Sequence, residues 1–332
     1  MSSEHGSTNL ERQIRSQPGA LAHMLESASV RQQVHEASEG LARARRIWTV
    51  GTGTSQHAAA LGAAMLQEAG RSAHAVSSMQ FVRNAPIVGP QDAVIVITHT
   101  AETAYALAAR ALAFQAGLDV VMITKRDSGF PDAIETVEKE SSETYTVSYT
   151  TALLALAMLA AEVGAESLTP DALASVPDAV RAAIDAPGTE GVERPGRMLT
   201  IFGGGPASVT AREAALKVRE ASRTLAEGFD AEFFLHGSAV PMTADDRLVA
   251  ITTPDPDGFV EGVARAGEAE GIKVTRVTES SALPPVLAQI PLTVRFQLLA
   301  LRFALAKGQD PDTVIVGAWN DPDLWRIGAP GS

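Results

Sequence analysis

Three ionisable side chains occupy a predicted helix at spacings that bring them onto one face. Glu213, Lys217 and Glu220 follow one another at intervals of four and three residues in the segment REAALKVRE. Residues at those intervals are neighbours on a helix, so the lysine can pair with a carboxylate. A carboxylate in such a cluster can act as a general base when partial burial raises its pKa. The same spacing is also typical of a solvated helix face with ordinary ion pairs.

A glycine turn and a lone histidine border this helix. Residues 203–205 are three glycines that follow the apolar run MLTIF, a predicted strand. Such a turn brings bare backbone N–H groups to the start of a helix, which makes Gly204 a candidate backbone contact to a ligand. His236 stands beside Gly237, sixteen residues after Glu220, where a capping or core histidine is the structural alternative.

Hydroxyl groups gather in two other predicted turns. The turn 98–103, THTAET, follows the apolar strand AVIVI and precedes a predicted helix. Its candidate ligand groups are Thr98, His99, Thr100 and Thr103. Hydroxyl and amide donors at a helix start suit a phosphate dianion, and Thr54 and Ser55 in the turn after IWTV can donate to the same group. Helix capping by Thr98 or Thr100, with Glu102 in a capping box, is the alternative.

Neither a cofactor nor a metal is expected. The turn GTGTSQH lacks the third glycine of a dinucleotide fingerprint, because Gln56 stands in its place, and the next strand, AHAVSS, ends without an acidic residue. The seven histidines are scattered, none pairs with another at ligand spacing, and the chain has no cysteine.

The composition limits the classes of partner. The chain has 332 residues with 45% hydrophobic content, a net charge of −12 and a pI near 5.1, which argues against a nucleic-acid-binding surface. The polar start MSSEHGSTNLERQ has no apolar h-region, and the Ala-rich run 151–166 is too short for a bilayer and contains Glu162. We therefore expect no membrane partner and a cytoplasmic location.

Short β-rich runs alternate with predicted helices, which indicates an α/β fold with parallel strands and ligand loops at their carboxyl ends. The pattern repeats at an offset of about 150 residues: MLTIFGGGPASVTAREAALKV mirrors IWTVGTGTSQHAAALGAAM. We predict a helical lead-in over 1–45, a first α/β domain over 46–182, a linker over 183–196, a second α/β domain over 197–308 and a tail over 309–332.

These motifs resemble the sugar isomerase (SIS) domain family in its tandem form. That family includes the isomerase half of glucosamine-fructose-6-phosphate aminotransferase and related phosphosugar deaminases and deglycases. The turn 53–58 matches its G-T-S-x-H-A pattern, 98–103 matches S-x-S-G-E-T with hydroxyl exchanges and Ala for Gly, and 213–220 with His236-Gly237 matches E-x-A-L-K-x-x-E followed by H-G. The resemblance implies two tandem three-layer α/β/α domains with parallel sheets, flavodoxin- or Rossmann-like.

The resemblance also implies roles for individual residues. Glu220 stands where the family's base moves a proton between C1 and C2 of an open-chain sugar, and His236 stands where a histidine assists ring opening. Glu213 and Lys217 would brace Glu220 or orient its helix. The phosphate and hydroxyl contacts would be Thr54, Ser55, Thr98, Thr100 and Thr103. The family pairs subunits, so a homodimer or larger homo-oligomer is expected, with His57 a candidate to reach across the interface.

The sequence departs from the family at several points. The aminotransferase carries a glutaminase domain with a nucleophilic cysteine, which is not found here, so glutamine-dependent synthesis by this polypeptide is not expected. Its tail lysine is also missing: Asp310-Pro311-Asp312 continues as TVIVGAWNDPDLW, with Trp319 roughly in the lysine's place. The first-domain loop that reads S-T-K in the family is TYTVSYTT.

Three functions therefore remain open. The favoured one is a phosphosugar enzyme of the deaminase, deglycase or aldose–ketose isomerase type, acting on a hexose or amino-hexose phosphate. The second is a catalytically inactive phosphosugar sensor that kept the pocket and lost the lysine chemistry. The third, a structural or partner-binding protein, does not account for hydroxyl-rich turns.

Overall fold

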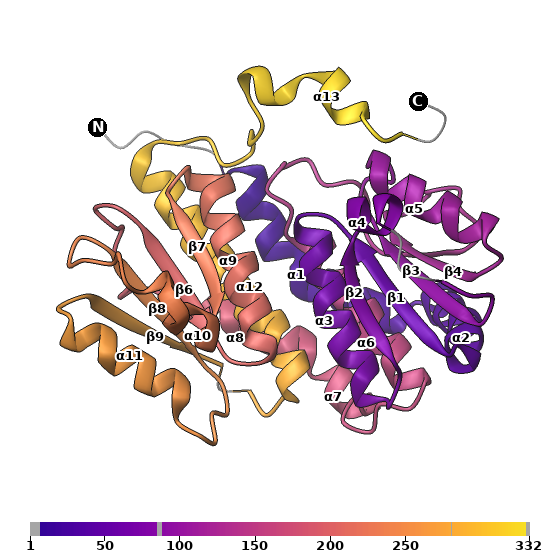
Figure 1. The fold of residues 1–332 in the computed structure, drawn as a ribbon, viewed down its shortest axis with the longest axis horizontal. Helices are drawn as coiled ribbons and strands as arrows, with labels where there is room; N and C mark the ends of the chain where they lie inside the picture. Colours follow the sequence, from indigo (N-terminus) through magenta and orange to yellow (C-terminus); the bar gives the residue numbers. More distant parts are fainter. Residues whose placement is uncertain (1–6, 85–87, 280, 330–332) are drawn as a thin grey trace. The chain divides into compact units, whose positions relative to one another are not determined.

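The computed structural model describes residues 7–84, 88–279 and 281–329, which fold into two compact units, each built around one parallel sheet (Figure 1). The β1 unit comprises residues 17–140, 147–177 and 315–332. The β6 unit comprises residues 1–16, 141–146 and 178–314. The division falls inside the first helix, α1 (Asn9–Glu26).

The sheet of the β1 unit has the strand order β2-β1-β3-β4-β5, and every neighbouring pair is parallel. Its strands are β1 (Arg46–Gly51), β2 (Ala73–Ser77), β3 (Asp92–Ile97), β4 (Asp119–Thr124) and β5 (Ala133–Glu135). All six residues of β3 are buried, as expected for a strand covered on both faces. The strand order reverses between β1 and β3, so their carboxyl ends form the switch point at which open α/β sheets bind ligands.

Helices cover both faces of this sheet. On one side α3 contacts α6, and α2 also packs against α6; on the other, α4 contacts α5. The helices and the 3-10 turn of the unit are α2 (Ala28–Arg43), α3 (Thr54–Glu68), α4 (Ser78–Arg83), α5 (Ala104–Gln115), α6 (Val147–Glu162), α7 (Pro170–Ala174), η2 (Gly317–Asn320) and α13 (Pro322–Arg326). Helix α6 begins at Val147, so only the start of the TYTVSYTT segment is a loop.

The β6 unit has the strand order β7-β6-β8-β9, again parallel throughout. Its strands are β6 (Leu199–Gly203), β7 (Ala226–Asp230), β8 (Arg247–Thr252) and β9 (Lys273–Thr278). Helix α9 contacts β6, β7 and α12, whereas α11 contacts β8 and β9. The helices are α8 (Val176–Asp185), which starts at the unit boundary, α9 (Pro206–Ser222), α10 (Ala231–Phe233), the π-helical η1 (Phe234–Ser238), α11 (Phe259–Ala269) and α12 (Pro285–Lys307).

The two sheets repeat one another in backbone detail. The turn after β1 contains Gly53 with φ 57° and ψ −131°, and the turn after β6 contains Gly205 with φ 53° and ψ −130°. Both glycines stand directly before a helix, in a conformation that side chains rarely adopt. The predicted α/β fold with parallel strands is therefore confirmed, and the sequence repeat corresponds to a repeated strand-turn-helix geometry.

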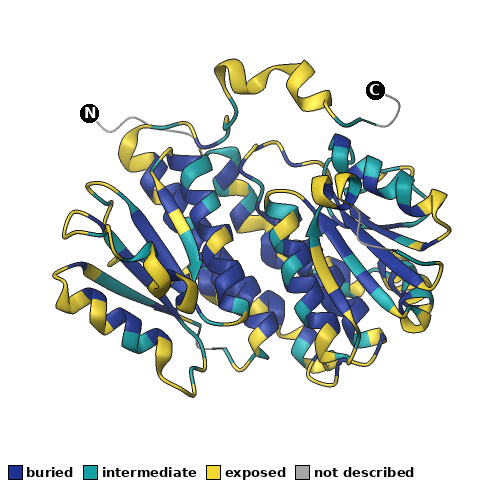
Figure 2. Ribbon diagram, in the orientation of Figure 1, coloured by how far each residue is buried: buried dark blue, intermediate teal, exposed yellow. Residues whose placement is uncertain are grey.

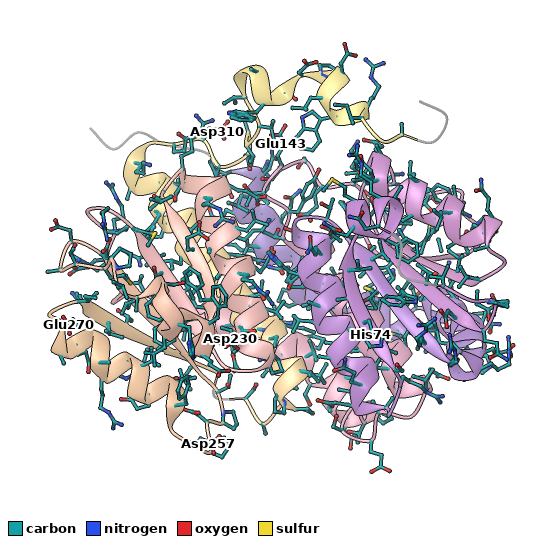
Figure 3. All side chains as sticks on the ribbon, viewed as in Figure 1. His74, Glu143, Asp230, Asp257, Glu270 and Asp310 are labelled. Carbon is teal, nitrogen blue, oxygen red and sulfur yellow. The ribbon has the colours of Figure 1, made fainter. Side chains whose placement is uncertain are left out.

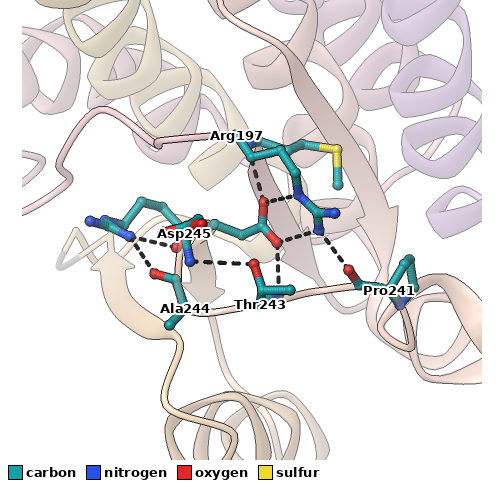
Figure 4. Close-up of polar contacts among 8 residues, drawn as sticks. Arg197, Pro241, Thr243, Ala244 and Asp245 are labelled. Carbon is teal, nitrogen blue, oxygen red and sulfur yellow. Dashed lines mark hydrogen bonds and ion pairs between the residues drawn. The ribbon is translucent and has the colours of Figure 1, made fainter.

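An ion pair between a partly exposed arginine and a buried aspartate is repeated as well. In the β6 unit, the Arg197 guanidinium donates to both oxygens of Asp246, whose carboxylate also accepts the backbone N–H groups of Met198 and Thr243 (Figure 4). In the β1 unit, Arg46 donates to both oxygens of Asp92 at 3.1 and 2.7 Å. Each pair ties the start of a central strand to the start of its neighbour, so both sheets are fixed at the edge opposite the ligand loops.

The turn that follows α12 is anchored within the β6 unit. The Asp312 carboxylate accepts the N–H groups of Asn9 and Leu10 at 2.8 and 2.7 Å, capping α1. Glu143 donates its N–H to the Asp312 carbonyl, and Thr144 donates its hydroxyl to the Pro311 carbonyl. Glu143 and Asp310, at the two sides of this arrangement, are labelled in Figure 3.

Helix α12 is the one helix of the described residues that is long and apolar enough to span a membrane. Of its apolar window, 89% is buried inside the structure, and Figure 2 shows the dark, buried stretches of this helix. Core helices of globular proteins have the same character.

Candidate functional site

Helix α9 carries the cluster predicted from spacing. The Lys217 ammonium lies 2.5 Å from Oε2 of Glu220 and 3.5 Å from Oε1 of Glu213. The side chains of Lys217 and Glu213 are fully buried, whereas one fifth of the Glu220 side chain is exposed. The solvated-face alternative is therefore wrong for this helix, and Glu220 is the member of the cluster that reaches solvent.

The surroundings of Glu220 raise the pKa of its carboxyl group. Burial raises the pKa of the Glu220 carboxyl above its ordinary value, and the nearby Glu213 carboxylate raises it further. The charge and hydrogen bond of Lys217 act in the opposite direction without cancelling the effect of burial. A carboxylate whose pKa is raised is a stronger base than an ordinary one, so it is better suited to accept a proton from a substrate and to return it.

Close backbone packing holds α9 in place. Gly228 of β7 lies so close to the helix that a Cβ atom there would stand 2.3 Å from the Ala211 carbonyl oxygen. Gly203, at the end of β6, would bring its Cβ to 2.8 Å from the Cβ of Ala207. Small residues at these contacts let the strands β6 and β7 pack closely against α9. This close packing sets the position of Glu220, which α9 carries, relative to the sheet.

His236 and Gly204 are placed differently. His236 lies in η1 with a non-helical backbone, is exposed, and forms no hydrogen bond with Glu220 among the described residues. Gly204 precedes the N-cap Gly205 of α9, half-buried at the carboxyl end of β6. Within the β6 unit the structure thus places Glu213, Lys217 and Glu220 together on α9, and His236 on a different element, η1.

The hydroxyl turn of the β1 unit lies at the carboxyl end of β3. The buried Thr98 hydroxyl donates to the Thr103 hydroxyl at 3.3 Å, and the Thr100 hydroxyl accepts the N–H of Glu102 at 3.2 Å. Thr103 is the N-cap of α5 but forms no side-chain capping bond. Capping by Thr98 or Thr100 does not account for this turn, because neither is the N-cap.

His99 is a neutral, structural member of the turn. Its Nε2 atom accepts the N–H of Glu140 at 3.0 Å, which places the ring proton on Nδ1. Burial, together with the charges of Lys125 and Lys139, lowers the pKa of His99 to about 4. At neutral pH the imidazole carries no positive charge, so it can orient the turn but cannot neutralise a phosphate.

The second hydroxyl turn meets the same edge of the sheet, because β1 and β3 are parallel neighbours. Thr54 and Ser55 open α3 after the N-cap Gly53, and all three residues Thr54, Ser55 and His57 are half-buried. Over the described residues, no group of three His, Asp or Glu side chains is placed to hold a metal ion.

The SIS domain family matches residues 40–162, the range that contains both hydroxyl turns. Residues 40–162 are therefore similar to a SIS domain, and we call this range the SIS domain after the match. This confirms the resemblance that the motifs indicate.

A relative of the chain is the isomerizing glutamine–fructose-6-phosphate aminotransferase of Thermococcus kodakarensis, which is 28% identical over 91% of this chain and 56% of its own length. The chain thus spans about half the length of the curated relatives it matches. The fold is also that of tagatose-6-phosphate ketose/aldose isomerase from Escherichia coli, with 21% identity, coverage of 93% and 96% of the two chains and a TM-score of 0.79. Glucosamine-6-phosphate deaminase from Thermotoga maritima has 18% identity, coverage of 92% and 97% and a TM-score of 0.77.

In the β6 unit, the turn after β8 corresponds to the hydroxyl turn of the SIS domain. There, a side chain of the turn itself accepts the free N–H groups at the start of the next helix. Asp255 follows β8, and its carboxylate accepts the N–H groups of Phe259, Val260 and Glu261 at 3.2, 2.9 and 3.4 Å. A carboxylate therefore already occupies the anion position at the start of α11. In the SIS domain, by contrast, the N-cap residue Thr103 forms no such side-chain bond to the start of α5.

The segment Lys139-Glu140 holds the hydroxyl turn of the SIS domain, and it was not predicted from the sequence. Lys139 donates to both carboxylate oxygens of Glu102 at 2.8 and 2.9 Å, and the adjacent Glu140 N–H binds His99. The Glu140 carboxylate in turn accepts the N–H of Ser148 at the start of α6. These contacts join residues about 40 positions apart, so local patterning contained no signal for them beyond the charge pair itself.

Proposed function

We propose that this chain binds a hexose or amino-hexose phosphate and moves a proton between C1 and C2 of its open-chain form, as a deaminase, deglycase or aldose–ketose isomerase. The observation that carries the proposal is Glu220, a largely buried carboxyl group with a raised pKa that still reaches solvent. An enediol or enolamine step needs one such group near both carbons. The names of the relative and of the two similar structures support this class of substrate.

The phosphate is assigned to the SIS domain. Thr98, Thr100 and Thr103, joined by Thr54 and Ser55, present hydroxyl groups at the switch point of its sheet. The first N–H groups of a helix lack intrahelical acceptors, and those of α5 are not capped by Thr103. Gly204 is assigned to a backbone contact with the sugar.

Two tandem SIS domains are the organisation that we propose for the whole chain, one in each unit. The shared strand order and the matching Gly53 and Gly205 turns support this. The boundaries proposed for the two domains remain 46–182 and 197–308.

His236 is proposed as the group that assists ring opening, although it lies on an exposed segment. Three exposed apolar side chains flank it: Phe233, Leu235 and Val240 are 64%, 48% and 83% exposed. A second copy of the chain that covered this surface would desolvate His236. A homodimer or larger homo-oligomer, with His57 as a candidate to cross the interface, is the assembly consistent with this role.

A phosphosugar sensor without catalysis is the second candidate. It is favoured by one observation: residues 313–332 contain no lysine, so they supply no amine for an imine with a ketose. Such a protein would bind the ligand and leave it unchanged.

The test is a screen of hexose and hexosamine phosphates that records thermal shift, ammonia release and interconversion of aldose and ketose. Stabilisation by one of them together with its conversion supports the enzyme. Stabilisation without conversion of any supports the sensor. If none of the sugar phosphates stabilises the protein and none is converted, both candidate functions are contradicted.

A further inference from the structure

A phosphate in the hydroxyl turn needs positive charge that the turn itself does not supply. The chain carries a net charge of −12, and the turn contains the exposed carboxylate of Glu102. His99 is uncharged at neutral pH. Hydroxyl and amide donors can orient a dianion, but charge-assisted bonds to a cation are about twice as strong as neutral ones.

The end of β4 is bonded directly to this turn. The Lys125 N–H donates to the carbonyl of His99 at 3.1 Å, and the Thr124 hydroxyl donates to the same oxygen at 3.3 Å. One residue earlier in the turn, the Thr98 N–H donates to the Ile123 carbonyl at 3.0 Å. The backbone of Lys125 is therefore fixed beside the proposed phosphate position.

The ammonium group of Lys125 is the cation near the turn that has no ion-pair partner among the described residues. Its side chain is half-buried. By contrast, Lys139 is held by both oxygens of Glu102, and Arg126 lies 3.9 Å from Glu138. The charge of Lys125 reaches the turn, because it contributes to the lowered pKa of His99. A half-buried ammonium without a carboxylate partner is available to an anionic ligand.

We propose that Lys125 binds the phosphate group of the ligand and supplies the positive charge that the hydroxyl turn lacks, while Lys139 neutralises Glu102. The inference rests on the proposed phosphosugar function and assigns the residue that recognises its anionic end. Lysine serves here as a point charge, so an arginine should replace it in part.

The experiment measures the dissociation constants of fructose 6-phosphate, glucosamine 6-phosphate and glucose 6-phosphate by titration calorimetry, for the wild type and for K125M. Loss of a charged hydrogen bond should weaken binding by about 10- to 100-fold. K125R should recover part of the affinity. K273M, which removes an exposed lysine paired with Glu193 in the β6 unit, is the matched control and should bind like the wild type.

Salt separates a charge contact from a packing defect. Affinity of the wild type should fall between 50 and 500 mM NaCl, and the fall should be smaller in K125M, because that variant has lost the screened interaction. A K125M protein that binds as tightly as the wild type, or with the same salt dependence, would overturn the role of Lys125. A wild type that binds none of the three sugar phosphates would instead contradict the proposed function itself.

Discussion

The ammonium of Lys217 lies 2.5 Å from the Glu220 carboxylate and 3.5 Å from that of Glu213, so two carboxylates share one cation. The three groups stand on one face of α9, and Lys217 and Glu213 are fully buried. With both glutamates ionised the cluster carries one net negative charge. The Glu213 carboxylate is one of the groups that raise the pKa of Glu220, and burial is the largest cause.

Replacement of Lys217 should change the pH dependence of turnover. Lys217 lowers the pKa of Glu220, so in K217M that pKa rises further. On the acidic side of the pH profile, kcat/KM falls as the base becomes protonated. This acidic limb should therefore move to higher pH in K217M. R212M, on the exposed face of the same helix, should leave the profile in place. An unmoved limb in K217M would mean that Glu220 is not the titrating base.

Replacement of Glu220 by glutamine should not destabilise the fold above pH 7. Because the folded-state pKa of Glu220 is raised, its stabilising contribution is present below the unfolded pKa and is lost as the pH rises through the folded pKa. A neutral glutamine avoids the cost of the buried charge, and Lys217 keeps Glu213 as a partner. We expect a gain of about 0.5 to 2 kcal/mol in the free energy of unfolding at pH 8. Urea titrations at pH 5 and 8 measure it, and a clear loss at pH 8 would contradict the assigned charge balance.

The Arg197–Asp246 pair should make stability sensitive to acid. The Arg197 hydrogen bond lowers the pKa of Asp246, with burial acting against it. The stabilisation is present above the unfolded pKa and is lost as the pH falls through the folded pKa. D246N should cost about 1.5 to 3 kcal/mol at pH 7 and less in acid. D245N, at the exposed neighbouring residue, is the matched control and should have little effect at either pH. Equal losses of stability in D246N and D245N would contradict a specific contribution of the Arg197–Asp246 pair.

Ala101 should be a strained position in the hydroxyl turn. Its φ is 59°, a left-handed conformation that favours glycine. Glycine relieves the backbone strain of the folded state but increases the entropy of the unfolded chain. The net result for A101G should be a free energy of unfolding that is higher by about 0.5 to 1 kcal/mol. A108G, inside α5, should lower it by about 1 kcal/mol. Thermal or urea unfolding compares the two, and a loss of stability in A101G would show that the turn holds Ala101 without strain.

Sequence patterning was sufficient for the central strands of the sheets, because strands such as AVIVI are buried on both faces and read as continuous apolar runs. The short β5 and the polar β7 escaped prediction. Strand β7, AEGFD, is an edge strand with one fully buried residue, so it has no apolar pattern. The helical face of Glu213, Lys217 and Glu220 was predictable from spacing, but its burial depends on α12 and β7, which pack on α9 from other parts of the chain.

The contacts of the candidate site were harder to predict than its residues. Motif spacing identified Thr98 and His99, but not that the His99 ring is tied to Glu140 and is neutral. The closure of the second turn by Asp255 also required the three-dimensional structure, since an acidic residue before a helix is common. Both facts depend on backbone geometry that composition does not encode.

The most direct test of the central claim is the turnover of E220Q with the sugar phosphate that the wild type converts, measured beside the dissociation constant of the same ligand. We predict that turnover falls by about 10² to 10⁴ while the dissociation constant changes little, because the variant keeps the hydroxyl turn and loses the proposed base. An E220Q protein that turns over its substrate at the wild-type rate would contradict the account.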